Sequence, residues 1–594
     1  MSARSLPVGV SSPPPQRPGP ELVPGRRFQP DSAITLRIGF WVFGSVLAAA
    51  QAWVFRYQVT ADSISYLDVS DGVMPGADWH GLINGVWSPL YPFLLGVFRR
   101  TFKISPASEI VAGHLLNVAI FLFAYFCFEL LLRVAINKLT LSDEGSGQDQ
   151  ARVFLPQWAY LTLGYALFLS ASILGISVKY LRADMLMSAF VYLAVAMLLH
   201  IQGRAGRWRN YAALGVVLGV GYLAKAPFLV IGLLILAAAL FSAKNWRLAL
   251  KMAASAFTIF LLIGSLYFVP LSLARGYFTL GESGRFNYLI HVNRVYPEWY
   301  MQNVGGAHGS FAHPVEKVFS SPPAYGFSWP SLVTHPLRID PSYWVAGVRP
   351  KFVAKGQIAA CLPSLRNLLE LQAQMVLVPI AALALAFISR RTGWILRLKS
   401  TWPMWAIGLV GCALYVPVHL ETRYVAEFLA LFWFGIVLAF RGPLPISRMV
   451  VRVGTILVAA SLLLPLTVSA GQLFTSVSEP NADAEAAAKL ADLGIRPGVK
   501  VARVSSFGSD LGIERLARVE IIGEVDVQHA KEFWMAPLRT QTSLLNLFAS
   551  RGAQAVIATL PQPGVGSSSG WRHLGSTRYW VWLPEQNHGD TTRR

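Results

Sequence analysis

Three carboxylates lie close together in the segment ADSISYLDVSDG at residues 61 to 72, directly after the first long apolar run of the chain. They are Asp62, Asp68 and Asp71. A carboxylate at a membrane surface can take a proton from an acceptor hydroxyl, or hold a metal ion against a phosphate leaving group. The alternative is structural: Asp62 or Ser63 caps a polar helix, and for Asp71 we favour such a structural role.

Two basic residues stand at the ends of apolar runs. Lys225, in GYLAKAPF, lies between two such runs. A charge there is costly unless it lines a cavity, pairs with a ligand or extends to the lipid headgroups. Arg423, in HLETRYVAEF, stays protonated and can bind a phosphate through two parallel hydrogen bonds. Its alternative is an ion pair with Glu421 or Glu427, and the pair with Glu421 is compatible with phosphate binding.

Further candidates lie in the segments between the apolar runs. Asp184, in LRADMLMSAF, either contacts metal or acceptor or forms an internal ion pair with nearby Arg182. The stretches GRFNYLIHVNRVYPEWY and AHGSFAHP contribute His291, Asn293, Arg294, His308 and His313. Aromatic-rich polar segments suit sugars, and they equally suit a loop at the headgroup level. The histidines lack the close spacing of metal ligands, so we do not expect a structural metal site there.

The composition shows which elements must position these residues. The chain has 594 residues, of which 54% are apolar and 14% charged, so most of its surface must face lipid. The net charge of +20 arises from short basic clusters between apolar runs, a pattern typical of membrane topology and not of nucleic-acid binding. The three cysteines are too few and too scattered for a disulfide framework.

Apolar runs long enough to cross about 30 Å of hydrocarbon predict about eleven crossings. They cover residues 34–55, 107–132, 153–174, 185–201, 209–224, 226–243, 250–272, 371–389, 402–418, 424–440 and 449–470. Every second connection is basic, which predicts a cytoplasmic N-terminus and an extracytoplasmic C-terminus. All the candidate residues above then lie on the outer side of the membrane.

Three regions follow from this pattern. Residues 1–33 are Pro-rich and basic and are expected to form a disordered cytoplasmic tail, residues 34–470 a transmembrane domain, and residues 471–594 a small extracytoplasmic α/β domain. The transmembrane domain carries two outer loops, 56–104 and 273–370. Within the first, SPLYPFLLGVFRR at 88–100 is too short to span and predicts an amphipathic helix in the membrane plane.

The order of these features resembles that of the GT-C glycosyltransferases, which use polyprenyl-phosphate sugars. The similar branch comprises the protein O-mannosyltransferases and aminoarabinose transferases, families 39 and 83. In that family an essential aspartate precedes an in-plane helix in the first outer loop, as Asp62 precedes residues 88–100 here. An acidic residue before the fourth helix matches Asp184, although Ala183 replaces the family's proline. A Lys-x-Pro setting matches Lys225, and a late Arg-Tyr pair matches Arg423 and Tyr424.

The resemblance implies transfer of a sugar from a polyprenyl-phosphate donor on the outer face of the inner (plasma) membrane. The expected catalytic residues are Asp62 as base and Asp184, and the expected substrate-binding residues are Lys225, Arg423, Tyr424, Glu421, Asp68 and His291. The expected partners are the lipid-linked donor, membrane lipids and a lipid, glycan or protein acceptor, with no nucleic acid. The protein O-mannosyltransferases carry an Asp-Glu pair where Ser63 follows Asp62, which argues against a protein acceptor.

Other functions stay open from the sequence. A polytopic transporter or lipid flippase is the main alternative, but such proteins usually contain internal repeats and midplane polar sites, and we find no convincing repeat. If the protein were only a membrane-anchored interaction protein, the position of these charged residues on one side of the membrane would have no explanation. A divalent metal ion is left open as a cofactor, and the sugar, the acceptor, the oligomeric state and the role of the C-terminal domain are not determined.

Overall fold

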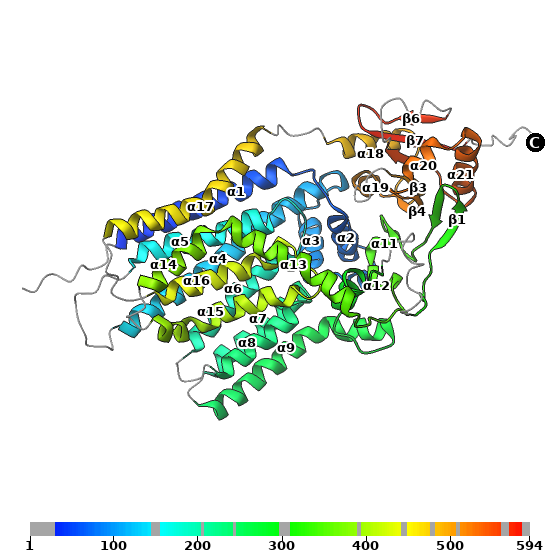
Figure 1. Ribbon diagram of the computed structural model, residues 1–594. Coiled ribbons are helices and arrows are strands. Elements are labelled where there is room, and N and C mark those ends of the chain that lie inside the picture. The colour runs from blue at the N-terminus through cyan, green and yellow to red at the C-terminus, as the bar shows by residue number, and fades with distance from the viewer. Residues whose placement is uncertain are drawn as a thin grey trace, which may run out of the picture.

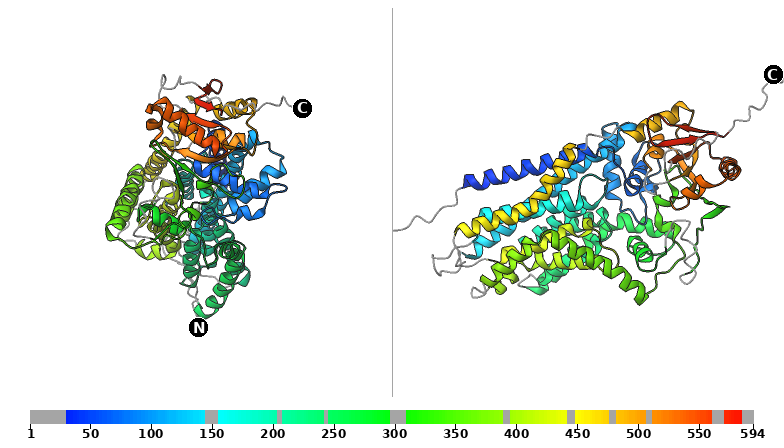
Figure 2. Two further views of the ribbon diagram at one scale, coloured as in Figure 1. Left: turned by 90° about the vertical axis from the view of Figure 1, so that its right-hand side faces the viewer. Right: turned by 45° about the horizontal axis from the view of Figure 1, so that its top comes forward.

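The computed structural model describes residues 30–143, 155–202, 207–241, 245–295, 309–388, 394–440, 448–475, 481–505, 511–559 and 570–584. The predicted disordered tail, residues 1–33, lies almost wholly outside this part of the chain. Long helices lie side by side, and a mixed sheet stands at one end of them (Figure 1). The end-on view shows the sheet and its helices as a separate layer beside the bundle (Figure 2). The predicted class, a multi-span helical membrane fold with a C-terminal α/β part, is confirmed.

Seven helices in the described residues are long and apolar enough to cross a membrane. They are α1 (Pro30–Val54), α4 (Glu109–Asp143), α5 (Gln157–Leu169) continued by the π-helical η4 (Ser170–Ile176), α6 (Asp184–Ile201), α9 (Trp246–Arg275), α16 (Thr422–Ala439) and α17 (Arg448–Thr475). An eighth crossing results if α13 (Ala354–Gln374) and α14 (Leu377–Ile388), which meet at a bend of 73°, are counted together.

The remaining predicted crossings correspond to shorter or less apolar helices of the same bundle. They are α7 (Trp208–Ala224), α8 (Phe228–Phe241) and α15 (Trp394–Tyr415). At 1.5 Å per residue α7 and α8 are about 25 Å and 21 Å long, short of the hydrocarbon thickness of about 30 Å. The basic residues Arg397 and Lys399 lie within the first turns of α15. By length and composition alone, the described residues therefore contain seven or eight full crossings, against the eleven expected from apolar runs.

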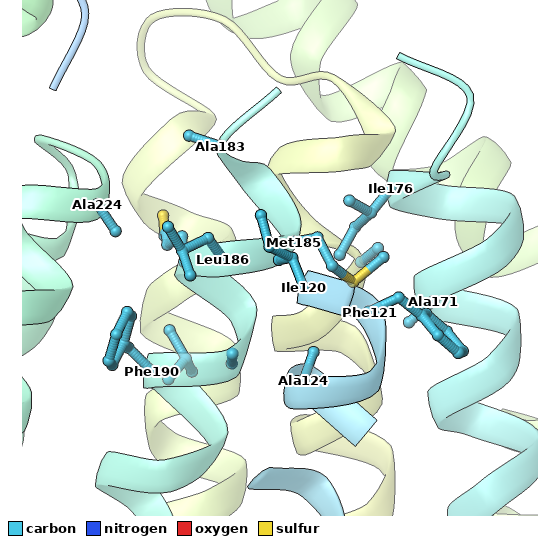
Figure 3. Packing of buried hydrophobic residues seen from close by; sticks show 14 of the residues in the cluster. Ile120, Phe121, Ala124, Ala171, Ile176, Ala183, Met185, Leu186, Phe190 and Ala224 are labelled. Carbon is cyan, nitrogen blue, oxygen red and sulfur yellow. The ribbon is translucent and has the colours of Figure 1, made fainter. Parts of the chain in front are cut away.

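The bundle core fixes the start of α6, where Asp184 is the first helical residue. Ile120, Phe121 and Ala124 of α4 pack between Met185 of α6 and Ile176 of η4 (Figure 3). The side chains of Ile120, Phe121 and Ile176 are at most 5% exposed. Because a close-packed core resists even small shifts, this packing holds the end of α6 in place.

Short helices and a hairpin make up the segments on the sheet side of the bundle. The first loop contains α2 (Ala61–Ser70), η1 (Asp71–Val73), η2 (Trp79–Leu82), the predicted in-plane helix α3 (Leu90–Thr101) and η3 (Pro106–Ser108). The long loop contains α10 (Ser283–His291), β1 (Glu316–Ser320), β2 (Pro323–Gly326), α11 (Pro336–Ile339) and α12 (Pro341–Trp344). The sequence predicted little helix in this long loop, and α13 at its end was missed.

The sheet has seven strands in the order β1-β2-β4-β3-β5-β7-β6. The strands of the C-terminal region are β3 (Lys500–Val504), β4 (Glu520–Val525), β5 (Val556–Thr559), β6 (Trp571–His573) and β7 (Tyr579–Trp582), with helices α18 (Ala482–Asp492), α19 (Gly512–Ala517), α20 (Ala530–Met535) and α21 (Leu538–Ser550). Strands β4, β3 and β5 are parallel. The hairpin β1-β2 from the long loop extends the sheet by pairing with β4. The expected domain boundary at residue 471 therefore leaves out two strands of this sheet.

Basic residues gather at the ends of helices far from the sheet. The charged positions at those ends are Arg133 and Lys138 on α4, Arg207 and Arg209 before and in α7, and Arg448 and Arg452 on α17. The sheet packs against the opposite helix ends, close to α2 and α11 (Figure 1). The sequence predicted that every second connection is basic, and in the structure these basic connections lie at one end of the bundle, while the sheet lies at the other.

Candidate functional site

A cavity of about 370 Å³ lies where the bundle end meets the sheet. This volume is within the range of small-molecule sites. Seven of the eight residues proposed from the sequence line it, together with others from α10, α11 and the end of β4. The seven are Asp62, Asp184, Lys225, His291, Glu421, Arg423 and Tyr424. Residues separated by more than 360 positions in the sequence therefore share one cavity.

Asp62 lies in the first turn of α2, with its side chain 30% exposed. Its Oδ2 accepts a hydrogen bond of 3.3 Å from Nη1 of Arg423 and lies 3.6 Å from Nε of Arg182. The helix is capped by Thr60, whose hydroxyl accepts from the backbone N–H of Ser63. The alternative that Asp62 or Ser63 serves as the N-cap is therefore wrong, and the Asp62 carboxylate is left for the cavity.

Asp184 forms a buried ion pair with Lys225. The Asp184 side chain is 5% exposed, and its Oδ2 also lies 3.5 Å from Nη1 of Arg423. Lys225 follows the last residue of α7, and its ammonium sits 4.3 Å from the centre of the Tyr424 ring. Lys225 thus pairs with a carboxylate of the protein and does not extend to the headgroups. Arg182, the alternative partner considered for Asp184, lies instead against Asp62.

Arg423 stands at the centre of the charged groups, in the first turn of α16. Its Nε donates to Oε2 of Glu421 at 2.7 Å, and its Nη2 donates to the hydroxyl of Tyr424 at 3.0 Å. The expected ion pair with Glu421 is present, and it leaves Nη1 directed at Asp62 and Asp184. A phosphate that enters this place competes with carboxylates for the guanidinium.

His291 and His419 stack face to face, with ring centres 3.9 Å apart. Nε2 of His419 also lies 3.2 Å from Oε1 of Glu421. Burial, with a further contribution from His419, lowers the pKa of His291 to about 4. For Glu421, burial favours the neutral form, but His419 and Arg423 outweigh it and hold the pKa of the carboxyl well below its usual range. At neutral pH His291 is therefore uncharged and Glu421 ionised.

Asp68 is the one proposed site residue outside the cavity lining. Its carboxylate accepts from Thr334, through N at 3.1 Å and Oγ1 at 2.8 Å, and from Nη1 of Arg515 at 2.7 Å. Three donors and a side chain only 3% exposed leave it no access to a ligand. The structure gives Asp68 a structural role in place of the substrate-binding role expected from the sequence.

Asp68 belongs to a buried cluster of three carboxylates and three guanidinium groups. The members are Asp68, Asp71, Glu109, Arg99, Arg515 and Arg518. All five N–H groups of Arg515 donate to carboxylates, at 2.7 to 3.0 Å. Burial opposes ionisation of Asp71, but the neighbouring Arg515 outweighs it and lowers the pKa of Asp71 well below its usual range. The structural role favoured for Asp71 agrees with this geometry.

The charged cluster joins four parts of the chain: the end of α2, α3, the start of α4 and α19 of the C-terminal region. Asp62 stands at the other end of the ten-residue α2. The cluster therefore fixes the helix that presents the candidate base and docks the C-terminal region onto the bundle. Sequence reasoning did not find Arg99, Glu109, Arg515 or Arg518, because nothing local distinguishes them from surface charges.

Several cavity residues were also missed. Tyr66, His335, Arg338, His419, Glu524 and Asp526 line the cavity, and none was proposed. A signal existed for Asp526, which directly follows the parallel strand β4, since ligands of open α/β sheets bind at the carboxyl ends of strands. The fully buried Tyr66 and the loop residue His335 give no comparable pattern in sequence.

No three His, Cys, Asp or Glu side chains of the described residues are grouped as metal ligands would be. Among the loop histidines, His313 stacks on Tyr343 and does not line the cavity, and His308 lies outside the described residues. Asn293 instead exchanges hydrogen bonds with the backbone of Lys351. Of the loop candidates in the described residues, only His291 reaches the cavity.

A second cavity of about 290 Å³ lies among the helices beside Arg423. Thr422, the neighbour of Arg423, is one of its lining residues. The others come from η4, the bend after α13, α16 and α17, and are mostly apolar: Ser170, Ala171, Leu174, Gly175, Leu371, Gln374, Met375, Ala426, Leu429, Ala430, Ser461, Leu462 and Pro465. A Cβ on Gly175 would lie 2.6 Å from Cβ of Ala426, so glycine permits the close approach of η4 to α16. We call this space the apolar groove.

Solved structures of membrane proteins resemble this chain. ArnT from Cupriavidus metallidurans in the apo state aligns over 91% of this chain and 97% of its own, with a TM-score of 0.40 and 14% identity. The same protein bound to undecaprenyl phosphate aligns over 93% and 98%, with a TM-score of 0.43 and 14% identity. The apo oligosaccharyltransferase of Archaeoglobus fulgidus aligns over 88% of this chain and 69% of its own, with a TM-score of 0.43 and 11% identity.

The likeness extends over most of the chain. It is nevertheless distant, and no family model and no curated protein matches the sequence. At 11% to 14% identity these structures assign no role to any residue of this chain.

Proposed function

We propose that this multi-pass membrane protein transfers a sugar from a polyprenyl-phosphate carrier to an acceptor hydroxyl. The observation that carries the proposal is that Arg423 lines a polar cavity with carboxylates, while its neighbour Thr422 lines the apolar groove. A polyprenyl-phosphate sugar has the same sequence of parts: a polar sugar, a phosphate and a long apolar chain. The phosphate would lie at Arg423, the sugar in the polar cavity and the chain in the groove.

The phosphate is the group that Arg423 and Lys225 bind best. Arg423 presents a fork of N–H donors, and Lys225 supplies a second charge, both at a water-poor helix end. Arg423 donates to Oδ2 of Asp62. A carrier phosphate takes over this donor and releases that oxygen of the Asp62 carboxylate.

The reaction then follows as a displacement at the anomeric carbon. Asp62 accepts the proton of the acceptor hydroxyl while the acceptor oxygen forms its bond to the carbon. The bond between that carbon and the phosphate oxygen breaks, and its electron pair leaves with the phosphate, which Arg423 and Lys225 stabilise. Attack in line requires the sugar carbon to lie between base and phosphate. Asp62 and Arg423 therefore have to separate from their 3.3 Å contact when the donor enters.

The other lining residues keep these groups in place. Asp184 neutralises Lys225 and lies 3.5 Å from Arg423, so it acts as a positioning residue for both. Tyr424 accepts a hydrogen bond from Arg423 and faces Lys225 with its ring. Glu421 orients Arg423 by accepting a hydrogen bond from its Nε. Uncharged His291, stacked on His419, can hydrogen-bond to a sugar or acceptor through its ring nitrogens.

We assign the site to the extracytoplasmic side of the inner membrane. The support is the basic residues at the far ends of the helices, since short cytoplasmic connections concentrate Lys and Arg. The acceptor is a lipid, glycan or protein hydroxyl that reaches the cavity beneath the C-terminal region. The transport alternative has less support, because the candidate charges gather at helix ends and not at the centre of the bundle.

The first test of the proposal concerns phosphate binding by Arg423. In Arg423→Lys the charge remains but the fork is lost, and we expect undecaprenyl phosphate to bind about 10- to 100-fold more weakly, as for the loss of one charge-assisted hydrogen bond. Titration of the purified protein in detergent measures this. Arg366→Lys, at an exposed Arg–Glu pair on α13, is the matched control and should bind as the wild type does. Equal affinity in both variants would contradict the assignment.

A second test concerns the apolar groove. Ser461 of α17 lines it, and in Ser461→Trp the indole fills the space. We expect about tenfold weaker binding of undecaprenyl phosphate, corresponding to about two methylene groups excluded from burial at about 0.8 kcal/mol each. A ten-carbon prenyl phosphate, whose short chain fills less of the groove, should lose less affinity. Ser265→Trp is the control, because Ser265 of α9 makes the same backbone hydrogen bond outside the groove. A loss for the short chain as large as for the long chain would exclude the groove as the binding place of the chain.

A further inference from the structure

The side of the polar cavity opposite the bundle is built by the sheet. Glu524 at the end of β4, and Asp526 and Val527 directly after it, line the cavity together with His335 of the long loop. None of these residues belongs to the charged groups proposed for the phosphate or the base. We call Glu524, Asp526 and His335 the acidic wall.

One carboxylate oxygen of Asp526 accepts hydrogen bonds, and the other has no hydrogen-bond partner among the described residues. Its Oδ1 accepts from the backbone N–H groups of Gln528 at 2.6 Å and His529 at 3.2 Å, which holds the carboxylate in one orientation. Its Oδ2 is buried and has no hydrogen-bond partner among the described residues, and the residue is 3% exposed. Burial raises the pKa of the carboxyl to about 6. A buried polar atom without a partner is costly, and a ligand in the adjacent cavity can supply the missing donor.

Glu524 and His335 form the second half of the acidic wall. Nε2 of His335 lies 2.8 Å from Oε2 of Glu524, both side chains being less than 10% exposed. Nδ1 of His335 has no hydrogen-bond partner among the described residues. The contact with Glu524 fixes the imidazole ring of His335, so its Nδ1 is held in a defined place beside the cavity.

The charges of the cavity lining are distributed unevenly. Five carboxylates line it, from Asp62, Asp184, Glu421, Glu524 and Asp526, against three bases, Lys225, Arg338 and Arg423. Asp184, Glu421 and Glu524 are paired with Lys225, Arg423 and His335, whereas no ion pair to a side chain of the described residues involves Asp526. The Asp526 carboxylate therefore disfavours a phosphate beside it. A group that donates hydrogen bonds is attracted to it.

We propose that Asp526, Glu524 and His335 form a specificity subsite that binds hydrogen-bond donors, hydroxyl or amino groups, of the transferred sugar. This inference rests on the proposed function, in which the carrier phosphate lies at Arg423 on the bundle side. The sugar is bonded directly to that phosphate, so it extends across the cavity toward the sheet. The acidic wall then selects the sugar, and the bundle residues bind the part common to all carriers.

The test separates sugar recognition from carrier recognition. Dissociation constants are measured for bare undecaprenyl phosphate and for a panel of undecaprenyl-phosphate monosaccharides, neutral and amino sugars included, with wild type, Asp526→Asn and Asp492→Asn. The wild type should bind at least one member of the panel more tightly than the bare carrier. Asp526→Asn, which keeps the capping oxygen, should lose this preference by at least tenfold and bind the bare carrier unchanged. Asp492→Asn, at an exposed carboxylate of α18, should behave as the wild type does.

The outcomes distinguish the two claims. Unchanged binding of the bare carrier shows that Asp526→Asn is folded, and unfolding temperatures check this independently. Wild-type preference for a sugar that Asp526→Asn retains in full would overturn the subsite and leave the proposed function in place. A wild type that binds neither the bare carrier nor any sugar-bearing carrier would overturn the proposed function and this inference with it. The panel member that loses affinity in the variant identifies the sugar as neutral or amino-bearing.

Discussion

Asp62→Asn should abolish sugar transfer while leaving donor binding intact. Asn cannot accept the proton of the acceptor hydroxyl, and removal of a general base lowers turnover by about 10²- to 10⁴-fold. The Asp62 carboxylate competes with phosphate for Arg423, its hydrogen-bond partner at 3.3 Å. The affinity for undecaprenyl phosphate should therefore stay the same or increase. Turnover of a lipid-linked donor and binding of the bare carrier, measured on the same preparation, test both parts.

The matched control is Asp78→Asn. Asp78 lies in the same outer loop, but its side chain is 73% exposed and paired with His80 away from the cavity. This variant should transfer sugar at the wild-type rate. If Asp62→Asn also retained its turnover, Asp62 would be removed from the mechanism. If it instead lost turnover together with carrier binding, its role would be to shape the site and not to act as base.

Arg515→Met should destabilise the protein strongly. Arg515 is 2% exposed, and the substitution leaves Asp68, Asp71 and Glu109 without their central partner. Breaking a buried ion pair by removing one member costs about 3 to 5 kcal/mol, because a charge stays buried without compensation. This loss of free energy weakens the docking of the C-terminal region and the position of α2, so activity should be lost as well. Thermal unfolding in detergent, and hydrogen exchange of α2, measure the two effects.

Arg551→Met provides the comparison. Arg551 and Glu316 also form a bidentate pair, at 2.6 and 2.7 Å, but their side chains are 39% and 61% exposed. A surface pair of this kind contributes about 0 to 1 kcal/mol. A destabilisation by Arg515→Met no larger than that of Arg551→Met would show that the buried cluster does not hold the two parts of the protein together.

The parts of the fold that follow from local pattern could be predicted. Within residues 471–594, expected from the sequence to be α/β, the segments VKVARVSS, VEIIGEV and AQAVIAT have the apolar pattern of strands and contain β3, β4 and β5, and NADAEAAAKLADLG has a helical pattern and contains α18. The amphipathic run at 88–100 forms α3. Hydropathy located the bundle helices, but it could not show that α7 and α8 are shorter than the other helices or that the chain bends by 73° between α13 and α14. Those features depend on packing and not on composition.

Some residues of the candidate site could likewise be predicted from the sequence, and others could not. Asp62, Asp184, Lys225 and Arg423 stand at the ends of apolar runs, and a charge at such a place is conspicuous in sequence. Their convergence on one cavity follows from the alternation of the helices. Asp68, expected to bind substrate, lies six residues after Asp62 in α2 and is buried against Arg515. Asp526 of the acidic wall could be suspected from its place directly after β4, but its approach to the bundle residues depends on how β4 docks, which no local pattern encodes.

The most direct test of the central claim uses purified wild-type protein in proteoliposomes that contain extracted lipids and acceptors. Free polyprenyl phosphate is measured after addition of polyprenyl-phosphate sugars to the side of the C-terminal region. A sugar transferase releases the free carrier, and this release should disappear in Asp62→Asn. Movement of intact donor across the bilayer, with no carrier released from any donor by well-folded protein, would contradict the account and indicate a lipid transporter.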